Sequence, residues 1–174
     1  MRRINKSICL ILIIDCEYSP NMRFICDDNL GKLAKWLRTL GYDTLFSQTI
    51  SDQELISQAL KEDRTILTRD TRLVQMKSVT KYLLIESDQP LKQLKQVKEK
   101  FNLKIDEQIF FSRCLVCNTV LEKIEKESIK EKIPPYVYKT QNTFVYCGKC
   151  DKIFWVGTHV QRMSQRLKES KIIE

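Results

Sequence analysis

Acidic side chains follow the apolar segments of this sequence at the points where buried strands are expected to end. Asp27 directly follows the segment RFIC (residues 23–26), and Asp70 follows TILT (residues 65–68) after a single arginine. In an open parallel sheet, ligands bind beyond the carboxyl ends of the strands. An acid at the end of a buried strand therefore predicts a site for chemistry at this edge of the sheet.

Two further acids are predicted at the same edge. Asp52 lies in the first turn of a predicted helix, and Asp88 lies three residues beyond the segment KYLLI (residues 81–85). Each also has a local interpretation, because Asp52 can favour the helix dipole and Asp88 can cap the helix that starts at Pro90. Clustered carboxylates repel one another unless a cation lies between them, and their oxygens suit Mg²⁺ or Mn²⁺. Such an ion activates water and stabilises charge at a phosphate, which predicts phosphodiester hydrolysis.

Four of the seven cysteines form two C-x-x-C pairs, Cys114 with Cys117 and Cys147 with Cys150, separated by 29 residues. This pattern is typical of a tetrahedral Zn²⁺ site in a zinc ribbon. The zinc is predicted to be structural, since four thiolates leave no open position for a substrate. A redox dithiol is the alternative, but it would not need two matched pairs. Metal-binding cysteines favour a reducing compartment, and we predict the cytoplasm.

The elements that position these residues alternate between strand and helix. The helices show apolar residues at helical spacing, a capping box of Ser51 and Glu54, and Pro90 at a first helical position. The predicted strands are residues 23–26, 43–46, 65–68 and 81–85, and the predicted helices are residues 29–41, 51–63 and 90–101. Short apolar strands that alternate with helices favour a parallel sheet covered on both faces.

The chain is therefore predicted to be an α/β protein with three segments. Residues 1–22 form an N-terminal extension, residues 23–105 a three-layer domain with a parallel sheet, and residues 106–174 a small zinc ribbon with a C-terminal basic helix. The extension has a basic start and an apolar run of about eight residues, which is too short to span a bilayer. It resembles the core of a signal peptide, but Asp15, Cys16 and Glu17 follow where small residues are expected. We expect no membrane partner.

The formal net charge of +8 favours a polyanionic partner such as nucleic acid. This charge is spread along the chain, because residues 114–174 hold 11 Lys/Arg against 7 Asp/Glu and account for half of the excess. Lys32 and Arg38 lie on one helix face, which either contacts phosphates or is simply solvated. Phe154 and Trp155 can stack on bases, although a core role is favoured. By residue type alone, His159 is more simply structural than RNA-binding.

Five stretches of the chain together resemble the Mut-seven C-terminal ribonuclease family, in which a PIN-like nuclease domain is fused to a Cys₄ zinc ribbon. The resemblance covers about residues 23–168, and the stretches are RFICDDNLGKLAKWLRTLGYDT, SDQEL, RTILTRD, RCLVCN and FVYCGKCDKIFWVGTH. It implies a PIN-like fold and RNA cleavage with Mg²⁺ or Mn²⁺. It also implies that Asp27, Asp52 and Asp70 hold the ion, with Asp88 as a possible fourth acid.

The leading hypothesis is therefore a metal-dependent ribonuclease. The resemblance places Arg38 and Arg69 at positions that suit phosphate contacts, and it implies a role for His159. The RNA-binding residues predicted from charge and resemblance together are Lys32, Arg38, Arg69, His159 and Arg162. The alternative is a non-catalytic RNA- or ribosome-binding module, in which the acids only end strands and the zinc ribbon and the positive charge bind RNA. No oligomeric state is predicted.

Overall fold

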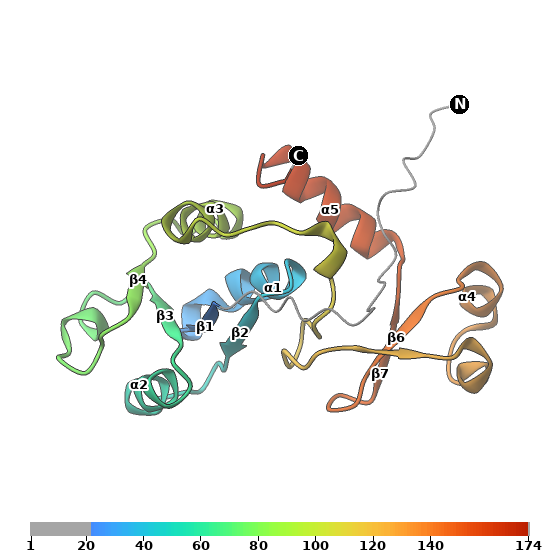
Figure 1. Ribbon diagram of the computed structural model, residues 1–174, viewed down its shortest axis with the longest axis horizontal. Helices are drawn as coiled ribbons and strands as arrows, with labels where there is room; N and C mark the ends of the chain where they lie inside the picture. Colours follow the sequence, from blue (N-terminus) through green and yellow to red (C-terminus); the bar gives the residue numbers. More distant parts are fainter. Residues whose placement is uncertain (1–21, 174) are drawn as a thin grey trace.

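A four-stranded parallel sheet forms the centre of the larger unit in the computed structural model, which describes residues 22–173 (Figure 1). Its strands stand in the order β2-β1-β3-β4, and every neighbouring pair is parallel. They are β1 (Arg23–Cys26), β2 (Asp43–Phe46), β3 (Thr65–Thr68) and β4 (Tyr82–Leu84). Because β2 and β3 lie on opposite sides of β1, the chain changes direction next to β1, as it does at a ligand-binding switch point.

Helices cover both faces of this sheet. Figure 1 shows α1 (Gly31–Thr39) and α3 (Pro90–Phe101) on one face and α2 (Asp52–Lys61) on the other. The side chains of β1 alternate accordingly, since Phe24 and Cys26 pack in the cluster of α1 and α3 while Ile25 packs against α2. The predicted three-layer α/β architecture is confirmed.

Local sequence explains how the helices begin. The Ser51 side chain and the Glu54 side chain form the predicted capping box at the start of α2, and Pro90 is the first residue of α3. The helix predicted at residues 29–41 starts instead as a 3₁₀ turn, η1 (Asp28–Leu30), which Asp27 caps by accepting a hydrogen bond from the Asp28 amide.

A three-stranded antiparallel sheet of order β5-β6-β7 forms the smaller unit, the ribbon. Its elements are β5 (Glu122–Ile124), β6 (Phe144–Cys147), β7 (Lys152–Trp155) and the short helix α4 (Pro135–Thr140), with 3₁₀ turns at η3 (Glu107–Ile109) and η4 (Lys126–Ile129). A third 3₁₀ turn, η2 (Leu73–Gln75), follows β3 in the larger unit. The predicted small C-terminal ribbon is thus present.

The last helix, α5 (Thr158–Glu169), returns from the ribbon to the larger unit (Figure 1). Met163, Leu167 and Ile172 are buried in the same core cluster as α1 and α3, and the Lys98 ammonium donates to the Ile172 carbonyl at 2.6 Å. The division of the chain at residue 105 remains a prediction, but by packing α5 belongs with the α/β core.

The predicted N-terminal extension lies outside the described residues, apart from Met22. Within residues 22–173, no helix has both the length and the apolar character that crossing a membrane requires.

Candidate functional site

The carboxylate of Asp27, at the end of β1, is held by two short hydrogen bonds. Its Oδ2 accepts from the Thr68 hydroxyl at 2.6 Å, and its Oδ1 accepts from the Asp28 amide at 2.7 Å. The Thr68 oxygen accepts in turn from the Asp70 amide at 2.9 Å. Thr68 therefore joins the Asp27 carboxylate to the backbone of Asp70, and it fixes the orientation of the Asp27 side chain, which is buried.

Asp70 presents an ionised carboxylate at the same edge. Its Oδ1 accepts a hydrogen bond from the Arg72 amide at 2.7 Å, and this bond holds the pKa of the Asp70 carboxyl below its ordinary value. The side chain is 34% exposed, so water and solutes reach it. Sequence reasoning missed Thr68 and the Arg72 amide as partners of these acids, since nothing in the pattern of residue types marks them.

The other two predicted acids lie on neighbouring loops at this carboxyl edge of the sheet. Asp52 is the first residue of α2, and Asp88 lies between β4 and α3; both are exposed. Each of the four acids therefore follows the carboxyl end of a strand in the chain, at or before the start of the next helix or turn. However, no three acids in the described part of the chain have carboxylate oxygens that all lie within 4.8 Å of one another. Among the described residues, only the four cysteines bring their ligand atoms this close.

The sulfurs of Cys114, Cys117, Cys147 and Cys150 all lie within 4.8 Å of one another. The Sγ atoms of Cys114 and Cys150 are 3.9 Å apart, and those of Cys117 and Cys147 are 3.4 Å apart. Zn–S bonds of about 2.3 Å in a tetrahedron separate the sulfurs by about 3.8 Å, so the donor set fits one tetrahedral metal ion. None of the four cysteines is in a disulfide.

The four thiols cannot all ionise easily without a cation. Burial raises the pKa of Cys117, but hydrogen bonding to the side chain and backbone of Thr119 outweighs burial and brings it to about 6. The pKa of Cys150 is raised to about 12, chiefly by its hydrogen bond with Cys117. A metal ion between the sulfurs would favour all four thiolates together.

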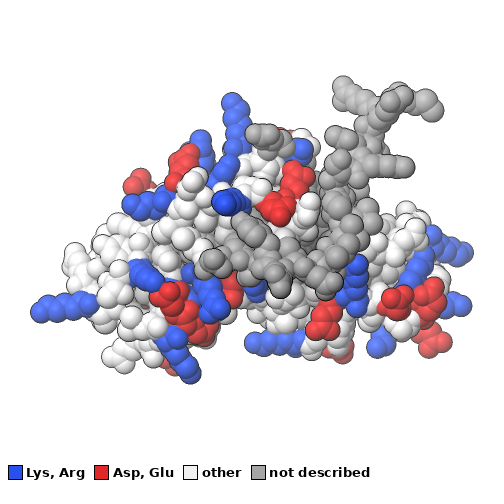
Figure 2. Space-filling view, in the orientation of Figure 1, with Lys and Arg blue, Asp and Glu red and all other residues white. Residues whose placement is uncertain are grey.

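Most of the basic residues predicted to bind RNA are exposed. Lys32 lies at the start of α1 and Arg69 lies beside Asp70, so both are near the carboxyl edge, while His159 and Arg162 lie on α5. On the face drawn in Figure 2, basic and acidic side chains are interspersed and form no single basic patch. The even spread of charge predicted from the sequence agrees with this view.

Arg38 differs from this group and requires a correction. Its side chain is only 3% exposed, and its guanidinium donates to the backbone carbonyls of Thr44, Leu115 and Val116 at 2.8–3.0 Å. These bonds tie α1 and β2 to the loop between Cys114 and Cys117. A guanidinium that is buried and committed in this way does not reach RNA phosphates, and we exclude Arg38 from the RNA contacts.

The model of the Mut7-C RNAse domain family matches residues 22–167. The chain belongs to this family. The match includes both the α/β unit and the ribbon, and the resemblance inferred from the sequence is confirmed. Membership of this family suggests a nuclease-like function, and the family description names RNA as the substrate class. Comparisons with curated proteins and with solved structures give no match.

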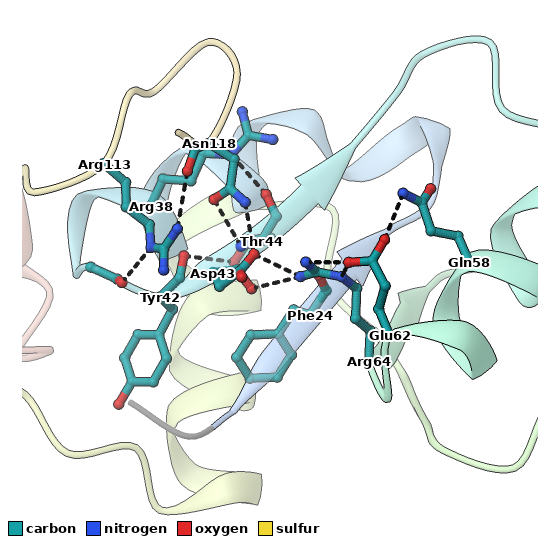
Figure 3. A network of polar contacts seen from close by, with 11 residues as sticks. Phe24, Arg38, Tyr42, Asp43, Thr44, Gln58, Glu62, Arg64, Arg113 and Asn118 are labelled. Atoms are coloured by element: carbon teal, nitrogen blue, oxygen red, sulfur yellow. Dashed lines mark hydrogen bonds and ion pairs between the residues drawn. The ribbon is translucent and has the colours of Figure 1, made fainter. Parts of the chain in front are cut away.

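The Mut7-C RNAse domain has a second polar cluster, which joins the ribbon to β2 (Figure 3). The Asn118 side chain accepts from the Thr44 amide at 3.0 Å and donates to the Asp43 carboxylate at 2.7 Å. The Arg113 guanidinium donates to the carbonyls of Gly41 and Asn118. Because β2 is an edge strand, Asn118 also satisfies one of its unpaired amides.

Arg64 extends this cluster along the amino edge of the sheet in the Mut7-C RNAse domain. It is 5% exposed and forms ion pairs of 2.7 Å with Asp43 and with Glu62, and it donates to the Phe24 carbonyl (Figure 3). The cluster lies at the opposite edge from Asp27 and Asp70, so its role is structural. Sequence reasoning missed it, because bonded members such as Asp43 and Asn118 are 75 residues apart in the chain.

Proposed function

We propose that this Mut7-C RNAse domain is a metal-dependent ribonuclease that hydrolyses RNA phosphodiester bonds with a Mg²⁺ or Mn²⁺ ion held by carboxylates. The observation that carries the proposal is that Thr68 joins the Asp27 carboxylate to the backbone amide of Asp70 at the switch point of the sheet. Membership of a ribonuclease family supports RNA as the substrate.

The residues at the carboxyl edge fit a hard divalent ion. Mg²⁺ keeps several waters and is commonly bound by one or two protein carboxylates together with substrate phosphates. Asp27 and Asp70 supply that number of carboxylates, one oriented by Thr68 and one kept ionised by the Arg72 amide. We propose Asp52 as the third acid of the site and Asp88 as a possible fourth, because both lie on adjoining loops.

Each residue has a defined part in this proposal. When bound, the ion activates a water and stabilises negative charge on the scissile phosphate. Asp27 and Asp70 hold the ion, and Thr68 keeps Asp27 in one orientation. The cationic groups of Lys32 and Arg69 attract RNA phosphates to the same edge of the sheet.

We further propose that the four cysteines hold a structural Zn²⁺ ion in a reducing compartment such as the cytoplasm. The sulfur geometry supports a tetrahedral ion. His159 and Arg162, both exposed on α5, are proposed to contact RNA beside the ribbon.

The test is cleavage of a fluorescently labelled single-stranded RNA in Mn²⁺ by Asp27→Asn and Asp70→Asn. Each change removes one carboxylate and is expected to lower the cleavage rate by about 100-fold or more, because even outer partners of metal ligands cost 10–100-fold. Asp63→Asn is the matched control, since Asp63 is 79% exposed on the turn before β3 at the amino edge. Equal zinc content in all variants shows that the fold is kept. Unchanged cleavage by both active-edge variants would reject the proposal.

A second candidate function is a non-catalytic RNA- or ribosome-binding module. The observation that favours it is that, among residues 22–173, three acids do not come within 4.8 Å of one another as the cysteines do. RNA binding that weakens steeply with salt and does not respond to Mg²⁺ or Mn²⁺ would support this candidate over the ribonuclease.

A further inference from the structure

A groove with a volume of about 660 Å³ opens on the ribbon, away from the carboxyl edge of the sheet. We call it the ribbon groove. Five of its lining residues carry rings: Phe111, Tyr136 of α4, Phe154 and Trp155 of β7, and His159 of α5. No acidic residue is among the described residues that line it, and Arg113 is its basic member.

Phe154 and Trp155 contribute to the core and to the groove at once. Phe154 packs against the cluster that contains Cys114 and Cys147, and Trp155 packs edge-on against Phe144 with ring centroids 6.5 Å apart. Phe154 and Trp155 therefore contribute to the core, as favoured from the sequence. Both side chains remain partly exposed and line the groove, and the indole N–H of Trp155 has no hydrogen-bond partner among the described residues.

Tyr136 has no structural reason to be aromatic. It is 76% exposed, whereas Tyr138 on the same helix packs against the ribbon core and lies under the Lys126 ammonium, 4.9 Å from its ring centre. Pro134 and Pro135 fix the start of α4 and so hold Tyr136 at the rim. An exposed aromatic ring beside a groove is suited to stacking on a ligand.

The charge around the ribbon groove suits a polyanion. Its lining has no acid, the imidazole of His159 is exposed there, and the chain carries a net charge of +8. The Arg113 guanidinium also lines the groove, but it donates to the carbonyls of Gly41 and Asn118 and is not counted as a phosphate contact. The first turn of α5 also lines the groove, and Gly157 provides no side-chain cap for its amides, which adds a favourable field for a phosphate. An apolar peptide would use only the rings, whereas a nucleotide uses the rings through its base and the start of α5 through its phosphate.

We infer that the ribbon groove binds an unpaired RNA base, stacked on Tyr136 and Trp155, with the adjoining phosphate near the start of α5. Aromatic side chains bind single-stranded RNA in this way, because every base has a π-face and duplex RNA does not present it. The inference rests on the proposed function only in taking RNA as the ligand. It gives the ribbon a role in selecting unpaired RNA, separate from the cleavage site.

The test uses Trp155 as its own reporter. Trp36 is 6% exposed, and Trp36→Phe leaves Trp155 as the single tryptophan of the full-length, metal-loaded protein. Its fluorescence is titrated with a 12-residue oligouridylate at low salt, without added Mg²⁺ or Mn²⁺. Saturable quenching is expected. Adding Tyr136→Ala is expected to raise the dissociation constant roughly 5- to 30-fold through loss of one stacking partner.

Tyr82→Ala is the matched control, because Tyr82 is 44% exposed on β4 of the other unit. This substitution is expected to leave RNA binding unchanged. No quenching by RNA, or equal dissociation constants for the Tyr136→Ala and Tyr82→Ala proteins, would overturn the inference. Quenching by an apolar peptide but not by RNA would overturn it in favour of a protein partner. Since no divalent ion is added, the outcome is independent of cleavage. Groove binding without RNase activity would support the inference and reject the proposed ribonuclease.

Discussion

Arg64 shows how a single buried charge holds the amino edge of the sheet together. Its guanidinium is 5% exposed and pairs with Asp43 and Glu62, and Asp43 also accepts from the ribbon residue Asn118. Removing one partner of a buried ion pair leaves the other charge uncompensated, which commonly costs 3–5 kcal/mol. Asp43 is therefore expected to be the residue through which this edge responds to pH.

We predict that Asp43→Asn lowers the free energy of unfolding by about 2–4 kcal/mol at pH 7. Burial raises the pKa of Asp43, but hydrogen bonds from Arg64 and Asn118 outweigh it, and the pKa in the folded state lies below the ordinary value. The stabilisation by Asp43 is thus complete above about pH 4 and is lost as pH falls through the lower folded-state pKa.

Thermal unfolding measured from pH 7 to pH 3 tests whether the stabilisation by Asp43 is lost on acidification. The gap in Tm between the wild type and Asp43→Asn should narrow towards pH 3. Asp63→Asn, whose acid forms an exposed pair with Lys81, should change stability by less than about 1 kcal/mol. A gap for Asp43→Asn that stays constant, or widens, on acidification would contradict the assignment.

At the scale of elements, α5 joins the ribbon to the α/β core. Leu167 is fully buried in the cluster of α1 and α3, and the Arg166 guanidinium lies 5.5 Å from the centre of the Trp36 ring. The helix follows the ribbon in the chain but is stabilised by contacts with residues that precede the ribbon. Stability of the larger unit should therefore depend on residues near the C-terminus.

We predict that Leu167→Ala lowers the free energy of unfolding by about 2–5 kcal/mol, because it leaves a cavity in the main core. Leu60→Ala is the matched control, since Leu60 on α2 is 56% exposed and its removal should cost less than about 1 kcal/mol. Urea unfolding followed by circular dichroism gives both values. Similar values for the two variants would show that α5 does not contribute to the core.

Sequence patterns could predict the strands but not the contacts between distant elements. The predicted strands at residues 23–26, 43–46 and 65–68 coincide with β1, β2 and β3, because each is a short apolar run with a clear boundary. Arg38 lies on a helix face that the sequence predicts to be solvated, but β2 and a loop 77 residues away in the chain bury it. Helical periodicity gives no information on contacts between a helix face and a distant loop.

The candidate site could likewise be predicted from the sequence only in part. Topology alone places Asp27 and Asp70 at one edge, since parallel strands end together. The hydroxyl of Thr68 joins the Asp27 carboxylate to the Asp70 amide. This role could not be predicted from the sequence, because a threonine at the end of a strand is common. The cysteine spacing predicted that the two pairs meet, because each pair is local and a tetrahedral metal site needs four ligands.

At the scale of the whole molecule, the two units are expected to unfold together. The loop between Cys114 and Cys117 is hydrogen-bonded to Arg38, the neighbouring Asn118 is bonded to β2, and α5 lies in the main core. A metal ion that organises the cysteines therefore also supports the packing of β2 and α1. This coupling would not exist if the ribbon were an independent appendage.

We predict a single calorimetric unfolding transition for the metal-loaded protein, shifted as a whole to lower temperature when a chelator removes the ion. Structural zinc sites provide folding free energy directly, and cooperative contacts spread the loss over both units. Two transitions, of which only one responds to the chelator, would contradict the coupling.

The central claim is that Asp27 and Asp70 together hold a divalent ion at the carboxyl edge of the sheet. The most direct measurement is calorimetric titration of Mn²⁺ into zinc-loaded protein, comparing the wild type, the double variant Asp27→Asn/Asp70→Asn and the control Asp63→Asn. We expect one Mn²⁺ site in the wild type and in Asp63→Asn, and its loss in the double variant. Equal Mn²⁺ binding by all three proteins, or by none of them, would contradict it.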